Sequence, residues 1–150
     1  MHGQSQRYVH TRVGVGGRMD TIQCAIVLAK LQLLEEEIRL RNLIGSRYNR
    51  LIDEAGIQRV IQRDDRTSVF GQYTIFVENR DELQAELKTA GIPTAVHYPL
   101  PLNLQPAYQN FSIKNSTPVA QQISGQVMSL PMGPYLSVDD QNKILSTLCL

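Results

Sequence analysis

The sequence of 150 residues contains no tryptophan, three phenylalanines and only two cysteines. Cys24 and Cys149 lie far apart in segments with helical patterning, which favours reduced packing residues over a disulfide or a metal pair. His97 has no cysteine, aspartate or glutamate nearby to act as a second metal ligand. These scarcities argue against a disulfide scaffold and a metal site, and they indicate a cytoplasmic protein.

An excess of charge and a long apolar run are lacking as well. With 15 basic and 14 acidic residues the formal net charge is +1, which is unlike the basic footprint of a nucleic-acid-binding protein. No apolar run approaches the roughly 18 residues of a membrane span. The N-terminal MHGQSQRYVHTR has no apolar centre. We therefore expect no secretory signal, no membrane and no nucleic acid among its partners.

The residues that are present predict three parts. Residues 1–17 are polar and glycine-rich and predict an arm. Residues 18–56 predict a long linking helix, because Asp20 can cap its start with Gln23 three positions on and no proline interrupts it. Residues 57–150 predict a small α+β domain. The expected fold is therefore α+β, with a long N-terminal helix followed by a small sheet on which helices pack.

Alternating strand and helix patterns predict the elements of the small domain. Runs rich in β-branched and aromatic residues predict strands at 68–78, 94–98 and 127–132. Capping residues and apolar periodicity predict helices at 81–90, 118–126 and 137–148. Ser137, with Asp140 three positions later, has the capping-box spacing at the start of the last helix.

The first half of the linking helix is unusually apolar. The segment IQCAIVLAKLQLL (22–34) is apolar around most of its circumference, and such a helix must be buried on all sides. A chain of this length has few apolar residues left to cover it. We therefore expect residues 20–34 to be covered by a partner surface, either a second copy in a homodimer or another domain.

Two segments carry candidate chemistry. GVGGRMD (14–20) places glycines before a helix N-terminus, where free amides attract anions, although a flexible hinge explains the glycines as well. Arg18 favours the anion site, because a guanidinium holds a carboxylate or phosphate in a fork. GIPTAVHYPLPL (91–102) holds His97 and Tyr98 in a segment that its prolines keep extended. His97 is then either a structural hydrogen-bonding residue or a ligand contact.

Three stretches together resemble one family. They are HGQSQRYVHTRVGVGGRMDTIQCAIVLAKL, SVFGQYTIFVENR, and GIPTAVHYPLPLNLQPAY with the later SLPM. They resemble the C-terminal part of the pyridoxal-phosphate (PLP)-dependent sugar aminotransferases of the DegT/DnrJ/EryC1/StrS family. The likeness is greatest to enzymes that aminate a UDP-linked 3-keto uronic acid sugar.

The resemblance implies a dimer with the fold of aspartate aminotransferase, in which the long helix leads from a large cofactor domain into a smaller C-terminal domain. It implies that Gly16 contacts the cofactor phosphate across the dimer, and that Arg18, His97 and Tyr98 contact the sugar. The family usually has asparagine where this chain has Gly16, so only a backbone contact can remain there.

The resemblance also implies a Schiff-base lysine upstream of the matching stretches. The lysines of this chain, Lys30, Lys88, Lys114 and Lys143, fall on predicted helices and in a loop, and none has the desolvated setting that a Schiff base requires. We therefore expect PLP in the full-length family but none covalently bound here, and no catalysis by the chain alone. Three roles stay open: half of a split enzyme completed in trans by a lysine-bearing large domain, a stand-alone UDP-sugar-binding module, and a self-associating module without a ligand.

Overall fold

The computed structural model of the chain describes residues 3–6, 9–17, 19–108 and 117–148. The fold is α+β, as the sequence predicts. Two compact units are present, Met1–Glu36 and Glu37–Leu150. Within the described ranges, no helix has both the length and the apolarity needed to cross a membrane.

The first unit contains a short hairpin and helix α1. Strand β1 (Gln4–Gln6) pairs antiparallel with β2 (Val9–His10) inside the segment predicted as a polar arm. Helix α1 (Thr21–Leu31) begins after Asp20, whose carboxylate accepts a hydrogen bond from the Ile22 amide at 2.9 Å. The predicted N-cap is therefore confirmed.

The helix predicted to run unbroken through residues 18–56 is interrupted. Helix α1 ends at Leu31, and α2 (Leu34–Glu54) begins after a two-residue turn. In this turn the Leu33 amide donates to the Lys30 carbonyl at 3.0 Å, an i−3 bond in place of the i−4 bond of an α-helix. Neither glycine nor proline occupies the turn, so helix-breaker signals do not predict it.

The second unit is built on a three-stranded antiparallel sheet in the order β3–β4–β5. The strands are β3 (Gln58–Arg59), β4 (Tyr73–Phe76) and β5 (Val127–Leu130). Two of the predicted strands are thus present in shortened form, and β3 was missed because two residues are too short for a periodicity to show.

The strand predicted at 94–98 is wrong. Only Ala95 pairs with the sheet, through an isolated antiparallel bridge to Ser129 at the free edge of β5. Pro93 and Pro99 bracket the segment, and prolines lack the N–H that would continue a ladder in either direction.

The helices of the second unit agree with the sequence patterns. They are α3 (Arg80–Thr89), α4 (Pro118–Ser124) and α5 (Val138–Leu148), with two 3₁₀ turns, η1 (Leu102–Leu104) and η2 (Pro106–Tyr108), before α4. Ser137 caps α5: its Oγ accepts a hydrogen bond from the Asp140 amide at 3.0 Å and donates to the Asp140 carboxylate at 2.6 Å. The predicted capping pair is confirmed.

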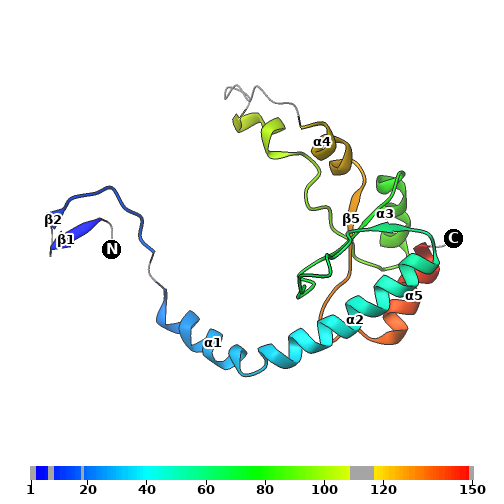
Figure 1. Cartoon of the computed structure of the whole chain (residues 1–150), viewed down its shortest axis with the longest axis horizontal. Helices are drawn as coiled ribbons and strands as arrows, with labels where there is room; N and C mark the ends of the chain where they lie inside the picture. The colour runs from blue at the N-terminus through cyan, green and yellow to red at the C-terminus, as the bar shows by residue number, and fades with distance from the viewer. Residues whose placement is uncertain (1–2, 7–8, 18, 109–116, 149–150) are drawn as a thin grey trace. The chain divides into compact units, whose positions relative to one another are not determined.

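The core lies between the sheet and the helices α2, α3 and α5 (Figure 1). It is formed by Ile44, Tyr48, Ile52, Tyr73, Ile75, Leu87, Ile92, Met128, Leu130 and Ile144. Two tyrosines in it keep their hydroxyls paired, because Tyr48 donates to the Pro131 carbonyl at 3.1 Å and Tyr73 donates to Asn49 Oδ1 at 2.9 Å. Burial raises the pKa of both phenols above the ordinary range.

Helix α5 is fastened to α2 by a buried amide. The Gln141 side chain is 1% exposed, and its Nε2 donates to the Ile44 carbonyl at 3.1 Å. Its oxygen accepts a hydrogen bond from Arg47 at 3.3 Å, so both ends of the amide are satisfied. This pairing fixes the position of the C-terminal helix against the core.

The Phe70 ring packs directly against Gly45 of α2. A Cβ at this position would stand 2.6 Å from the ring of Phe70, and Arg41 holds the Phe70 carbonyl at 3.0 Å. We expect Gly45→Ala to lower the free energy of unfolding by about 1 kcal/mol, because overpacking outweighs the helix preference of alanine. Urea unfolding measures the change. In a Phe70→Ala background the same substitution should stabilise the protein, and stabilisation in both backgrounds would contradict the clash.

Candidate functional site

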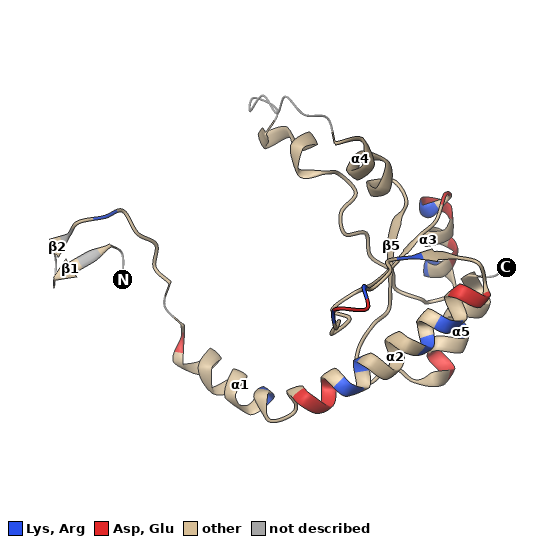
Figure 2. Cartoon of the chain, viewed as in Figure 1, with Lys and Arg blue, Asp and Glu red and all other residues tan. Residues whose placement is uncertain are grey.

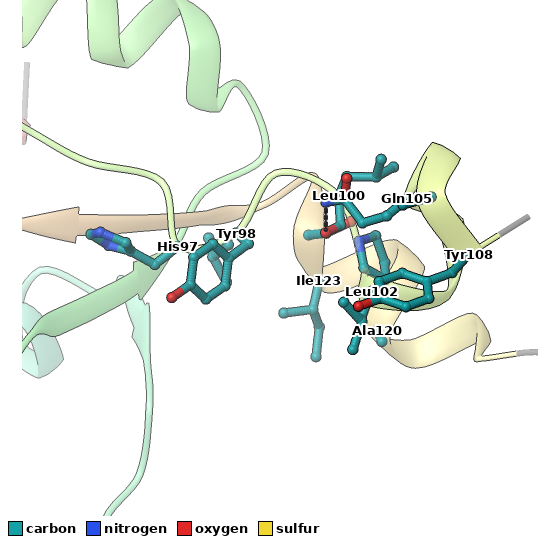
Figure 3. Close-up of a pocket in the computed structure, with 12 residues that line it drawn as sticks. His97, Tyr98, Leu100, Leu102, Gln105, Tyr108, Ala120 and Ile123 are labelled. Atoms are coloured by element: carbon teal, nitrogen blue, oxygen red, sulfur yellow. Dashed lines mark hydrogen bonds between the residues drawn. The ribbon is translucent and has the colours of Figure 1, made fainter. Parts of the chain in front are cut away.

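A pocket of about 700 Å³ lies beside His97 and Tyr98 in the second unit (Figure 3). One wall is the chain from His97 to Tyr108, and the other is α4 with the start of β5. Most of the lining is aliphatic and comes from Leu100, Leu102, Ala120, Ile123 and Val127. Gln105, Tyr108 and Ser124 add polar groups to it.

Local hydrogen bonds hold the wall of the pocket. The turns η1 and η2 are closed by bonds from the Leu104 amide to the Pro101 carbonyl and from the Tyr108 amide to the Gln105 carbonyl, at 3.0 Å and 2.9 Å. The Thr117 hydroxyl donates to Asn103 Oδ1 at 3.1 Å. This wall therefore keeps a defined shape although it lacks long helices or strands.

The predicted pair, His97 and Tyr98, sits together at one end of the pocket. Both residues are exposed, Tyr98 by 73%, and their rings meet edge to face with centroids 5.7 Å apart across a cis peptide bond. Figure 3 shows the His97 ring turned away from the cluster formed by Leu102 and Ile123. His97 Nδ1 lies 3.4 Å from Ser129 Oγ. The imidazole thus makes a structural hydrogen bond and still exposes an edge, and its contact with a ligand stays a prediction.

Two hydroxyls behind His97 were not singled out from the sequence. Ser129 Oγ lies 3.1 Å from Thr74 Oγ1 on the neighbouring strand, and the two hydroxyls continue the hydrogen-bonded chain from His97 into the sheet. The available signal was a single serine in the otherwise apolar VMSL of β5. Its partner Thr74 carried no signal, because strand pairing sets that contact.

Among the described residues, no Lys, Arg, Asp or Glu side chain lines the pocket. In the sequence from 89 to 138, Lys114 is the only charged residue. In Figure 2 the ribbon of α4 and of β5 carries neither the blue of Lys and Arg nor the red of Asp and Glu. Such a pocket suits a neutral or aromatic part of a ligand and offers hydrogen bonds, and its described residues provide no Lys or Arg for a phosphate or carboxylate.

The glycine turn predicted to contact phosphate lies in the first unit. The Gly17 amide donates to the Val15 carbonyl at 3.0 Å and closes a three-residue turn on Gly16, which is exposed. The Asp20 carboxylate already accepts from the start of α1, so an anionic group occupies this helix N-terminus. An anion at Gly16 must therefore bind the turn rather than the helix end. Arg18 lies outside the described residues.

The lysines do not fit a covalently held PLP in the residues that the structure describes. Lys30, Lys88 and Lys143 are exposed on helices, whereas a Schiff-base lysine needs a desolvated setting that faces the cofactor. Lys114 falls outside the described residues. Within the same ranges no group of three metal-ligating side chains occurs, and Cys24 is a half-buried free thiol. Cys149, like Lys114, is not described.

Known structures place this fold among the aminotransferases. The chain superposes with a TM-score of 0.90 on a DegT DnrJ EryC1 StrS aminotransferase from Brucella abortus, at 39% identity, with 98% of this chain and 40% of that chain covered. The DegT/DnrJ/EryC1/StrS aminotransferase family matches residues 1–149. The chain belongs to this family.

Individual relatives act on nucleotide sugars. The chain is 50% identical over 135 residues to the UDP-2-acetamido-2-deoxy-3-oxo-D-glucuronate aminotransferase of Pseudomonas aeruginosa, covering 90% of this chain and 37% of that protein. It is 34% identical to the dTDP-3-amino-3,4,6-trideoxy-alpha-D-glucose transaminase of Streptomyces venezuelae, with 90% and 36% covered. The chain thus spans less than half the length of these relatives.

Proposed function

We propose that these 150 residues form the substrate-contacting C-terminal part of a PLP-dependent aminotransferase that aminates a UDP-linked 3-keto uronic acid sugar. The observation that carries the proposal is the uncharged pocket with His97 and Tyr98 at its end, in a chain half identical to a UDP-3-oxo-sugar aminotransferase. An aminotransferase moves an amino group from an amino-acid donor to the keto carbon of the sugar.

In this proposal, different residues of the chain contact different parts of the substrate and the cofactor. The pocket receives a neutral part of the nucleotide sugar. His97 and Tyr98, at the end of the pocket, hydrogen-bond to the sugar. The family resemblance assigns Arg18 to the sugar carboxylate, which a guanidinium can hold in a fork. The backbone of the turn at Gly16 contacts the cofactor phosphate across the dimer.

The covalent chemistry requires a lysine from outside these residues. PLP supplies an electron sink for proton removal next to the amino nitrogen, and it must first be held by a desolvated lysine. A large domain bearing that lysine completes the site, either with this chain in one polypeptide or in trans. A stand-alone UDP-sugar-binding module is the second candidate, and the pocket is the observation that favours it.

The chain by itself is expected to show no transamination. Incubation with PLP, borohydride reduction and peptide mass mapping should give scattered, substoichiometric adducts on the lysines, because Lys30, Lys88 and Lys143 are exposed rather than enclosed in a desolvated site. A single lysine labelled at full yield, together with turnover of a UDP-keto sugar, would overturn the proposed division between this chain and a lysine-bearing domain.

The substrate contacts can be tested in a complete enzyme. We expect a chimera in which this chain replaces the matching region of the P. aeruginosa relative to transaminate the UDP-3-oxo sugar. In it, Tyr98→Phe and His97→Ala should each raise KM about tenfold, the loss of one hydrogen bond of about 1.4 kcal/mol.

Tyr135→Phe is the matched control for Tyr98→Phe, because its hydroxyl is paired with Glu37 at 2.9 Å outside the pocket. Equal effects of the two tyrosine substitutions, or an active chimera insensitive to both pocket substitutions, would refute the assigned contacts. An inactive chimera that folds and binds PLP would refute the family role itself.

We further propose that residues 20–34 form an interface with a second copy of the chain or with the large domain. Helix α1 buries none of its residues. Seven large aliphatic side chains between Ile22 and Leu34 are 40–73% exposed. A helix with this composition is stable only when its apolar surface is covered.

The isolated chain is therefore expected to form dimers, with α1 in the interface. Ile26→Glu should raise the dimer dissociation constant at least tenfold, because burying one isoleucine contributes about 1.5–3 kcal/mol. Light scattering at several concentrations measures the change. Val138→Glu on α5, a comparably exposed position at 58%, should leave it unaltered. A monomeric parent chain would exclude a second copy as the partner of this helix, and equal effects of both substitutions on a dimer would contradict the interface.

A further inference from the structure

A chain of three hydrogen-bonding side chains runs from the sheet to the pocket. Ser129 is the polar residue of β5 and is 5% exposed. Its neighbours Met128 and Leu130 belong to the core, so the Ser129 side chain lies on the opposite face of the sheet. Thr74 stands directly across from it on β4.

The backbone brings His97 to the same face. The Ser129 amide donates to the Ala95 carbonyl at 2.7 Å, and the Ala95 amide donates to the Ser129 carbonyl at 3.1 Å. This bridge brings His97, two residues beyond Ala95, within reach of the Ser129 hydroxyl. The His97 Nδ1 to Ser129 Oγ distance is 3.4 Å, and Ser129 Oγ to Thr74 Oγ1 is 3.1 Å.

The hydroxyls have a limited number of protons to share. Ser129 has one O–H and two lone pairs, and a neutral imidazole has one donor and one acceptor nitrogen. When Thr74 donates to Ser129, the single Ser129 proton is directed at His97 Nδ1. Nδ1 is then the acceptor, and the proton of the ring is on Nε2, at the exposed edge.

We propose that Ser129, supported by Thr74, is a positioning residue that donates to His97 Nδ1 and thereby presents Nε2–H as a donor to an oxygen of the substrate. The inference rests on the proposed role of His97 as a substrate contact. The 3.4 Å separation is at the long end for a hydrogen bond, and we expect it to shorten when Nε2–H donates to a substrate oxygen, because that donation makes Nδ1 a stronger acceptor.

The tautomer is read directly from the chain without any ligand. Long-range ¹H–¹⁵N spectra distinguish a protonated from an unprotonated ring nitrogen, and His97→Gln assigns the signals among the three histidines. We expect Nε2 protonated and Nδ1 unprotonated and hydrogen-bonded. A protonated Nδ1 in the parent chain would overturn the proposal.

Ser129→Thr and Ser129→Val form a matched pair, because threonine and valine have the same branched shape and only threonine keeps the hydroxyl. The chemical shift of Nδ1 should be unchanged in Ser129→Thr. In Ser129→Val it should move toward the value of an imidazole nitrogen without a hydrogen bond. In the chimera, Ser129→Val should raise KM several-fold over Ser129→Thr with kcat little changed. Identical Nδ1 signals in the two variants would refute the positioning role.

If the branched side chain unfolds both variants, Ser129→Ala and Thr74→Val provide the same comparison, with Thr147→Val on α5 as the control. Thr147 donates to the Lys143 carbonyl at 2.9 Å, away from His97. A failure of the proposed substrate contact and a failure of the proposed role of Ser129 give different results. An intact spectral effect with a KM indifferent to His97→Ala refutes the substrate contact alone, whereas an absent spectral effect refutes the role of Ser129.

Discussion

The second unit depends on the placement of β5 between two partners. β5 pairs with β4 along its whole length and meets Ala95 on its other edge, and all four of its residues are buried. One face of β4 and β5 supplies the core with apolar side chains. The other face carries Thr74 and Ser129 and brings His97 beside them. The same strand therefore holds the fold together and orients the candidate site.

The two units differ in how completely they bury their apolar residues. The second unit buries its apolar residues around Tyr48 and Ile75 and satisfies the polar groups among them, as Gln141 shows. Helix α1 of the first unit has comparable apolar content but buries none of it. This uncovered apolar surface is the observation behind the interface proposed for residues 20–34.

Much of the fold could be predicted because its signals are local. The Asp20 and Ser137 caps, the periodicity of α3, α4 and α5 and the apolar run of β5 are each encoded within a few neighbouring residues. The failures have equally specific causes. The turn at Leu33 contains no breaker residue, and the segment 94–98 has strand composition but prolines at its ends. Two-residue β3 exists only because β4 pairs with it.

The sequence by itself determined the α+β class, the family, and the pair His97–Tyr98 as candidates, since these depend on composition, order and adjacent residues. Only the tertiary structure decided what stands behind that pair. Ser129 lies 32 residues after His97, and Thr74 lies 55 residues before Ser129. Strand pairing brings these hydroxyls within 3.1–3.4 Å of their partners, and a sequence pattern does not specify the register that does so.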